Sequence, residues 1–376
     1  MNKCFILLLF VVARSSVSSA INTTNEGYQL TTNTRKIIYA NSICRVFMNT
    51  STTKTYFIPT KTAPEFNSFI SNPPSGVVVD TCRSCNDLKI GSGGTLASGV
   101  YDIDPDGSGG LGTVKFLCDM TTQGGGWTLV WSNTRGGTNK PVTSITWTNA
   151  TAGGVRCSTA NSSTYDFSGS CSMISSNKEA FNYFVGLNTW NALGRNKQYM
   201  EFRYTWSSAY GVATQQEARF AMQKFDSGDN YVIRLSNINQ TVGSQSPGIY
   251  SYHSASGYAF TTSDADHDVY GANCSSLYTN SPFWYGACWS GNMNGGGENG
   301  PGTGYQNAAY WTGATNADGN SSGDGGGNGW MWIRESDYYY SCAEAKNIGG
   351  FINSGTYTID SDGPGGAAAV STNCTM

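Results

Sequence analysis

The chain has 376 residues, of which 12% are charged, and its formal net charge is −3. The charged share is roughly half the usual one, which excludes a strongly basic nucleic-acid binder and a chain kept disordered by its own charge. The 47 glycines and the 13% of aromatic residues favour strands and turns with aromatic packing over long helices.

The N-terminal segment has the pattern of a secretory signal peptide over residues 1–20. Lys3 precedes a short apolar run from Phe5 to Ala13, and small residues follow up to Ala20. The run is too short to span a bilayer, which takes about 20 residues. Removal of the segment takes Cys4 away from the odd total of 11 cysteines and leaves ten that can pair in an oxidising compartment. We therefore expect a secreted, extracellular protein without a membrane span.

Residues 21–81 predict a small β-rich N-terminal module. Polar and apolar residues alternate in short runs, such as Arg35 to Ala40 and Thr55 to Pro59. The module ends at the turn-forming stretch from Asn72 to Gly76, which is rich in Pro and Gly.

Residues 82–336 are long enough for one domain with a sizeable core. A helix is predicted to begin near Ser176 and to continue through Leu187, because apolar residues follow a helical spacing there. Strands are predicted at residues 127–131, 199–206, 217–225, 231–238 and 330–334. The fold class is therefore α+β, with strands dominant.

An internal repeat links the start of this region to the C-terminus. Residues 98–110 match residues 354–366 at nine of 13 positions, and the cysteines that flank the two segments correspond as well. Residues 337–376 are therefore interpreted as a partial second copy of the domain start. The chain is either a fragment of a longer array or carries this copy as a stapled tail.

Several segments in a fixed order resemble the fibrinogen C-terminal-like domain. They include Ser84–Leu88, Phe116–Thr122, Gly124–Thr128, Phe260–Asp268 and Met331–Arg334. The resemblance covers residues 82–336 and implies a central, mostly antiparallel sheet, short helices and a calcium-binding loop subdomain. Intelectin-type lectins share the opening through Gly-Gly-Gly-Trp-Thr but lack the later Asp-rich loop, so they are the second choice.

A calcium site is predicted in the Asp-rich loop. Asp264, Asp266 and Asp268 alternate, and hard carboxylate oxygens of this kind suit Ca²⁺. The resemblance assigns side-chain ligation to Asp266 and Asp268, and main-chain carbonyl ligation to Tyr270 and Ala272. His267 is expected to face solvent, because imidazole is a poor ligand for Ca²⁺.

Two other acidic loops are weaker candidates for a cation. Asp102, Asp104 and Asp106 copy the start of an EF-hand loop, but Thr113 occupies the twelfth position, where a bidentate Glu belongs. We interpret this stretch as a hairpin turn, and the stretch from Asp318 to Asp324 as a flexible loop.

The resemblance places a ligand site beside the calcium loop. It implies a disulfide between Cys274 and Cys288 and a cis peptide bond before Cys288. Tyr285 and Trp289 would offer aromatic faces, with Asn292 and Asn294 as polar partners, which suits sugars or acetyl groups. Core packing is the competing interpretation of the aromatic residues here, and Trp284 is expected to be core.

The remaining cysteines are assigned on three different grounds. The resemblance implies Cys85 with Cys118, the repeat implies Cys342 with Cys374, and Cys157 with Cys171 is the simple local choice. Cys44 and Cys82 are then left to tie the N-terminal module to the domain. A redox role for Cys82-Arg-Ser-Cys85 is disfavoured without a thioredoxin-like context.

Eight Asn-x-Ser/Thr triplets fit N-glycosylation of a secreted eukaryotic protein. They begin at Asn22, Asn49, Asn149, Asn161, Asn239, Asn273, Asn320 and Asn373. Since such triplets also arise by chance in a chain rich in Asn and Thr, they are weak evidence for glycosylation.

No catalytic pattern is found in the sequence. The chain has two histidines and lacks zinc-protease, nucleophile-elbow and phosphate-loop motifs, so we do not expect an enzyme. The predicted function is a secreted, Ca²⁺-dependent recognition module, a lectin for glycans or acetylated groups on cell surfaces. The alternative is a structural or adhesive extracellular protein that binds other proteins through the same domain. No heptad or collagen-like repeat is present, so any oligomer would need another surface.

Overall fold

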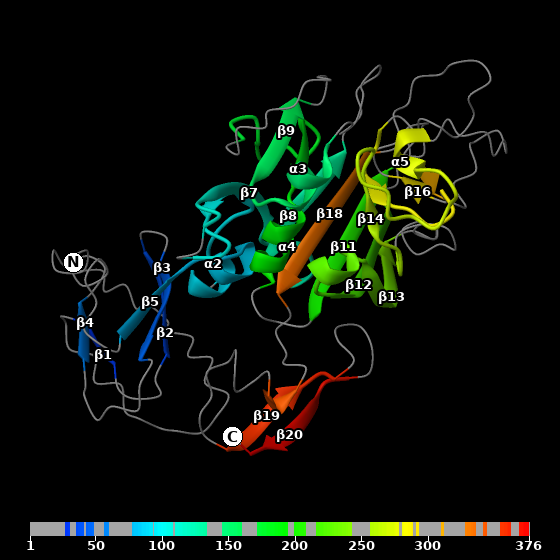
Figure 1. Cartoon of the computed structure of the whole chain (residues 1–376). Helices are drawn as coiled ribbons and strands as arrows, with labels where there is room; N and C mark the ends of the chain where they lie inside the picture. Colours follow the sequence, from blue (N-terminus) through cyan, green and yellow to red (C-terminus); the bar gives the residue numbers. More distant parts are fainter. Residues whose placement is uncertain are drawn as a thin grey trace.

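The computed structural model describes residues 82–92, 94–107, 110–133, 145–159, 171–194, 199–207, 216–242, 256–277, 280–288, 328–335, 341–343, 354–361 and 368–375 (Figure 1). It adds the backbone of isolated strands at residues 27–30, 35–40, 43–48, 56–59, 77–81, 291–292 and 310–311. The predicted signal peptide lies outside the described residues. No helix among the described residues is both long and apolar enough to cross a membrane.

A nine-stranded antiparallel sheet dominates the molecule, and with its short helices it confirms the predicted α+β class (Figure 1). Its order is β13-β12-β11-β18-β8-β10-β9, with the β6–β7 hairpin joined to β8 through β7. The strands are β6 (Gly99–Ile103), β7 (Val114–Asp119), β8 (Trp127–Asn133), β9 (Val155–Thr159), β10 (Phe181–Val185), β11 (Tyr199–Ser207), β12 (Gln216–Gln223), β13 (Arg234–Val242) and β18 (Asn328–Glu335). All five predicted strands of this region fall on strands of the sheet, with shifted ends for β12 and β13.

The helix predicted from Ser176 to Leu187 is wrong. Residues Phe181–Val185 form β10, which pairs with both β8 and β9 and is buried along its whole length. Four of the five residues of β10 are apolar, because both of its faces are covered, so its sequence does not alternate and imitates a buried helix. The helix of this region, α4 (Leu187–Leu193), begins only after Gly186.

The other helices are short and capped. In α2 (Cys85–Gly91), the Asp87 N–H donates to the side chain of the N-cap residue Ser84 (3.1 Å). In α3 (Trp147–Thr151), the Asn149 N–H donates to Thr146 Oγ1 (3.3 Å). α5 (Cys274–Leu277) is a single turn, and the described residues also include two 3₁₀ turns, η1 (Thr122–Gly124) and η2 (Ser227–Asp229).

The N-terminal residues form strands in two small sheets. β1 (Gly27–Leu30) pairs with β4 (Tyr56–Pro59), and β3 (Ile43–Met48) lies between β2 (Arg35–Ala40) and β5 (Val77–Thr81). The predicted run from Arg35 to Ala40 is β2, and the run from Thr55 to Pro59 contains β4.

The main core is an aromatic cluster centred on Trp131 of β8. Its ring lies 4.7 Å from that of Phe184, 6.3 Å from Phe260, 6.1 Å from Phe283 and 5.9 Å from Trp284. Phe260 and Phe283 belong to β14 (Phe260–Thr261) and β15 (Phe283–Trp284), which pair with each other. The aromatic contacts therefore fasten the loop region after residue 256 to the sheet.

A second buried cluster combines charge with aromatic packing around Trp127. The guanidinium groups of Arg334, Arg203 and Arg219 lie 4.3, 4.9 and 5.3 Å from the centre of the Trp127 ring. Three carboxylates balance these charges. Asp119 pairs with Arg203 (2.8 Å), Glu201 with Arg219 (2.8 Å) and Arg334, and Glu217 with Arg203 (3.9 Å).

This charged cluster also holds the Gly-Gly-Gly turn that precedes β8. Arg334 on β18 donates through Nη1 to the carbonyl oxygens of Gly125 (2.7 Å) and Gln123 (3.2 Å). Burial by itself would raise the pKa of Asp119, but the Arg203 charge and the N–H of Thr122 outweigh it and lower that pKa to about 2. The carboxylate is therefore held ionised inside the cluster.

The predicted C-terminal copy contains a hairpin with the same register as the β6–β7 hairpin. β19 (Gly355–Ile359) and β20 (Val370–Cys374) pair with Gly355 opposite Cys374, as Gly99 lies opposite Cys118 in β6 and β7. The buried Phe116 and Leu117 of β7 correspond to Thr372 and Asn373 of β20. The copy thus lacks the side chains that join β7 to the large core, and instead forms its own small cluster of Tyr357, Ile359, Cys374 and Cys342.

Four disulfides are present among the described residues. They join Cys85 to Cys118, Cys157 to Cys171, Cys274 to Cys288 and Cys342 to Cys374. Cys82 is also disulfide-bonded, and its partner lies outside the described side chains.

Candidate functional site

The Asp-rich loop leaves the sheet after β14 and returns to it at β15. A one-residue bridge between Thr262 and Ala265 closes its first turn. The disulfide between Cys274, at the start of α5, and Cys288 ties the two arms of the loop together. The Val269 N–H also donates to the carbonyl of Gly286 (3.4 Å). The loop is therefore a fixed platform, held by backbone pairing and a covalent link.

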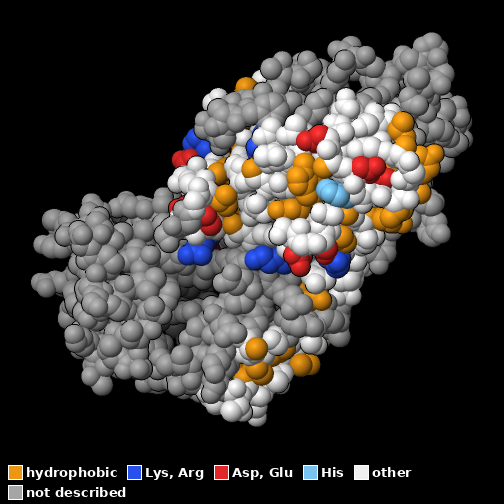
Figure 2. Space-filling view, viewed as in Figure 1, with side chains coloured by type: hydrophobic (Ala, Val, Ile, Leu, Met, Phe, Trp, Pro, Cys, Tyr) orange, Lys and Arg blue, Asp and Glu red, His pale blue; other side chains and the backbone are white. Residues whose placement is uncertain are grey.

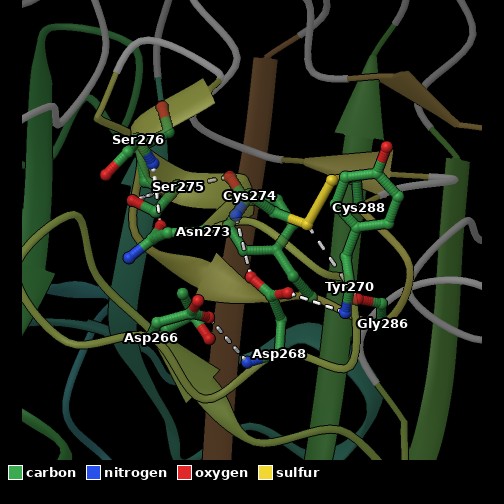
Figure 3. Close-up of a disulfide and its surroundings, with 12 residues drawn as sticks. Asp266, Asp268, Tyr270, Asn273, Cys274, Ser275, Ser276, Gly286 and Cys288 are labelled. Atoms are coloured by element: carbon green, nitrogen blue, oxygen red, sulfur yellow. Dashed lines mark hydrogen bonds between the residues drawn. A yellow bond between two sulfur atoms is a disulfide. The ribbon is translucent and has the colours of Figure 1, made fainter.

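Asp266 and Asp268 lie close together in this platform, and the Asp266 carboxylate points at the backbone N–H of Asp268 (Figure 3). The Asp268 N–H donates to Asp266 Oδ1 (3.2 Å). Asp268 in turn accepts from the N–H groups of Tyr270 (3.0 Å, at Oδ1) and Cys274 (2.8 Å, at Oδ2). Asp268 is thereby oriented by the backbone on both sides, whereas Asp266 is exposed.

The electrostatics of the pair are unfavourable without a counter-charge. Burial and then the nearby charge of Asp266 raise the pKa of Asp268, against the two backbone hydrogen bonds, which lower it. Within the described part of the chain, neither carboxylate forms an ion pair with Lys or Arg. A cation between the two oxygens would relieve this repulsion.

The donor set fits a hard cation that takes few protein side chains. The described residues contain no group of three or more His, Cys, Asp or Glu placed to hold a metal. Two carboxylates would therefore need main-chain carbonyls and water to complete the six to eight oxygens of Ca²⁺. Tyr270 and Ala272, the predicted carbonyl ligands, are exposed on the same loop, and no hydrogen bond to either carbonyl is seen among the described residues.

Asp264 does not join this pair. Its Oδ1 accepts from the Trp147 N–H (2.9 Å) and from Thr262 Oγ1 (2.7 Å), which fastens the loop to the first residue of α3. His267 is half-buried, and its ring reaches solvent only in part (Figure 2). Its Nδ1 donates to the Phe260 carbonyl (3.0 Å), and its ring packs edge-on against Trp147 (4.4 Å).

The prediction that Tyr285 binds ligand is wrong, because its side chain is fully buried and its hydroxyl donates to the Ser281 carbonyl (2.8 Å). Trp284 is buried as expected, with its indole N–H on the carbonyl of Tyr231 (2.8 Å). Phe283 and Trp284 of β15 and the next residue, Tyr285, are all fully buried, so this aromatic run belongs to the core. Core packing, the competing interpretation, is thus right for Trp284 and Tyr285.

The side chains of the other predicted ligand residues are not described in the structure. Trp289 and Asn294 are outside it, and Asn292 is described only as backbone in β16 (Gly291–Asn292), which pairs with β17 (Tyr310–Trp311). The expected cis peptide before Cys288 is absent, since none of the described peptide bonds is cis. Cys288 instead has a left-handed backbone, with φ of 65°.

Exposed apolar side chains surround the acidic pair, and the sequence analysis missed two of them. Val269 is 70% exposed, and Tyr270 and Leu277 are each 51% exposed. Figure 2 shows acidic and apolar side chains next to one another on one face of the described surface. A Val inside an Asp-rich loop is a usable sequence signal, because such a loop has no core in which to bury it.

The acidic stretch at residues 102–107 is the turn that the sequence predicts. Asp102 pairs with Lys115 across the hairpin (2.9 Å), and Asp106 Oδ2 accepts from the Leu111 N–H (3.1 Å). Burial and the neighbouring Asp106 raise the pKa of Asp104. The stretch from Asp318 to Asp324 lies outside the described residues.

Comparisons with known proteins agree with this architecture. A family model described as "Fibrinogen beta and gamma chains, C-terminal globular domain" matches residues 81–346. Techylectin-5A of Tachypleus tridentatus is 25% identical over 231 residues, which cover 60% of this chain and 66% of the relative. Fibrinogen-like protein A of Apostichopus parvimensis is 30% identical over 226 residues, covering 57% and 64%. The aligned part thus spans just under two thirds of the length of each relative.

Among solved structures, the fibrinogen-like globe domain of human ANGPTL6 superimposes with a TM-score of 0.47 at 22% identity. The match covers 68% of this chain and 96% of the other.

Proposed function

Because this chain belongs to the family of fibrinogen C-terminal globular domains, which are non-enzymatic binding modules, we propose that it is a secreted, calcium-dependent lectin. Its ligands are glycans or acetylated groups on cell surfaces. Four disulfides among the described residues support secretion, since such links persist in oxidising compartments. The name of the relative techylectin-5A marks that protein as a lectin, which supports the ligand class.

The neighbouring carboxylates of Asp266 and Asp268 carry the proposal. Calcium would be held by these two side chains and by the carbonyls of Tyr270 and Ala272, and would supply the positive charge that the pair lacks. The Asp268 carboxylate also holds the N–H groups of Tyr270 and Cys274. Anything that fixes Asp268 therefore fixes the segment that leads to the disulfide.

The ligand surface would be the exposed apolar rim next to this loop. Tyr270 and Val269 offer apolar faces against which the C–H face of a sugar or an acetyl methyl group can pack. Trp289 follows Cys288 in the chain, with Asn292 and Asn294 shortly after it, and the three would extend the rim with one more aromatic ring and two carboxamides.

Replacing Asp266 by asparagine should lower calcium affinity at least about tenfold, or ~1.4 kcal/mol, because one of two charged ligands is lost. Asparagine keeps an oxygen for the Asp268 N–H, so the turn should survive. The measurement is calorimetric titration of the full chain with Ca²⁺. Asp102→Asn is the matched control, since it removes an equal charge from an exposed residue outside the loop. Unchanged affinity in Asp266→Asn would contradict the metal assignment.

Glycan-array binding of the full chain, with calcium and then with a chelator, tests the function itself. We expect sugar binding that is lost on chelation, and lost in Trp289→Ala while calcium affinity stays at the wild-type level. A chain that binds calcium but no glycan would contradict the lectin and favour the adhesive alternative, in which the same rim contacts an extracellular protein.

A further inference from the structure

The first residue of the short helix α3, Trp147, contacts the Asp-rich loop at two points. Its N–H donates to Asp264 Oδ1 (2.9 Å), across a separation of 117 residues in the sequence. Its ring packs edge-on against the ring of His267, with 4.4 Å between the ring centres. The two contacts, here called the Trp147 clamp, therefore hold the loop just before and just after Asp266, one of the two proposed calcium ligands.

The other side of Trp147 is fixed to the core of the domain. Its ring lies 5.8 Å from that of Tyr231 and 6.5 Å from that of Phe260. Tyr231 is buried, and its hydroxyl donates to Asn188 Oδ1 on α4 (2.8 Å). Because close-packed side chains yield little, the clamp connects the loop to a rigid part of the molecule.

Asp264 has the geometry of a brace and not that of a ligand. Its Oδ1 accepts from the Trp147 N–H and also from Thr262 Oγ1 (2.7 Å). Within the described residues, no three acidic, His or Cys side chains are placed to hold one metal, so Asp264 does not converge with Asp266 and Asp268. Its carboxylate joins the loop to α3 instead.

His267 brings the second contact of the clamp into the site, because it lies between Asp266 and Asp268 in the chain. Its backbone N–H donates to Thr261 Oγ1 (3.1 Å), and its Nδ1 donates to the Phe260 carbonyl (3.0 Å). A fixed His267 restricts the backbone angles on both sides of it. These angles place the two carboxylates.

A site made of two like charges gains from such a constraint. The charge of Asp266 acts unfavourably on Asp268, so without a cation the two carboxylates would separate if the loop were free. A loop that is already held in its binding conformation loses less conformational freedom when calcium binds. The clamp should therefore raise calcium affinity without contacting the ion.

We propose that Trp147 is a positioning residue of the calcium site, which clamps the Asp-rich loop through Asp264 and His267 and couples calcium binding to the packing of α3. The proposal rests on the calcium part of the proposed function. Coupling between two sites is reciprocal, so calcium should stabilise α3 by the same factor by which the clamp strengthens calcium binding.

Two substitutions of Asp264 test the brace, with calorimetric titration of the full chain with Ca²⁺ as the measurement. Asp264→Asn keeps an oxygen for both donors and loses only a screened charge, so calcium affinity should stay within about threefold of the wild type. Asp264→Ala removes the acceptor, and affinity should fall at least about fivefold. Equal affinities in the two variants would overturn the brace. A fall in Asp264→Asn as large as that in Asp266→Asn would make Asp264 a ligand and overturn it as well.

Two substitutions of Trp147 test the ring contact by the same titration. Trp147→Ala should lower calcium affinity at least about fivefold. Trp147→Phe keeps both the N–H and an aromatic ring beside His267, so it should recover most of that loss. Wild-type affinity in Trp147→Ala would overturn the clamp, and the two Asp264 variants decide the matter if Trp147→Ala does not fold.

Hydrogen exchange of the full chain gives a readout that a merely structural role would not change. Calcium should slow exchange of the N–H groups in residues 146–151 at least about fivefold in the wild type, and not in Asp264→Ala at saturating calcium. Residues 155–159, which form β9, are the control peptide and should not respond. Calcium binding with unchanged exchange at 146–151 would overturn this proposal alone. A wild-type chain that binds no calcium would overturn the calcium site and this proposal together.

Discussion

Replacing Arg203 by methionine is expected to destabilise the domain by about 3–5 kcal/mol, because it leaves buried carboxylates without their counter-charge. Arg203 is 2% exposed, pairs with Asp119 and Glu217, and lies over the rings of both Trp127 and Trp332. Chemical denaturation of the full chain at neutral pH measures the loss. Arg203→Lys keeps the charge but not the planar fork, so an intermediate loss is expected.

Arg203→Met should also change how the stability of the domain depends on pH. The pKa of Asp119 is about 2 in the folded protein, against 3.8 as its ordinary value. Its pairing therefore stabilises the wild type above about pH 4, by roughly 2 kcal/mol, and this stabilisation is lost as the pH falls toward 2. Without Arg203, burial raises that pKa and only the hydrogen bonds from Thr122 oppose it, so this acid-sensitive step should shrink.

The double variant Arg203→Met with Asp119→Asn separates the contribution of charge to the stability of the domain from that of packing. If the lost counter-charge is the main cost, the double variant should be more stable than Arg203→Met alone, because the unpaired carboxylate is gone. A single Arg203→Met variant within 1 kcal/mol of the wild type would show that the cluster is not what stabilises this face of the sheet.

Gly125→Ala is the second change for which a large loss is expected, at least about 3 kcal/mol. Gly125 has φ of 68° and ψ of −172°, a region that residues with a side chain rarely adopt. An added Cβ would also lie 1.9 Å from the Met120 carbonyl oxygen, which is backbone and cannot rotate away. The turn would have to open, and the Arg334 contact to the Gly125 carbonyl would be lost with it.

Gly94→Ala is the matched control for this prediction. Gly94 also has a positive φ, of 76°, but an added Cβ would meet nothing within 4 Å. Its cost should be that of backbone strain alone, about 1 kcal/mol. Thermal unfolding of the two variants should therefore differ clearly. Equal stabilities would show that the turn can relax around a Cβ.

Most strands could be predicted from the sequence, because their patterns are local. β8, β11 and β18 are β-branched or aromatic segments bounded by turn residues, and each is recovered at its predicted place. β10 could not be recovered in this way. Whether an apolar run becomes a helix or a strand covered on both faces depends on which strands lie beside it, and here these are β8 and β9.

The candidate site could likewise be predicted only in part from the sequence. The Asp266 and Asp268 pair was found from residue type and spacing together with the family resemblance, and the structure places the two residues side by side, joined by a hydrogen bond from the Asp268 N–H to Asp266 (Figure 3). The packing of Tyr285 and His267 was not predicted, because it depends on residues far away in the sequence. The aromatic core takes up the ring of Tyr285, and Trp147 lies against the ring of His267.

The sequence by itself determined the family, the α+β class and the acidic loop, because each depends on the residues of one segment and on their order along the chain. Only the tertiary structure decided which aromatic residues are core and which Asp fastens the loop to α3. Burial and hydrogen-bond satisfaction depend on neighbours brought together from distant segments, and a linear pattern does not specify those neighbours.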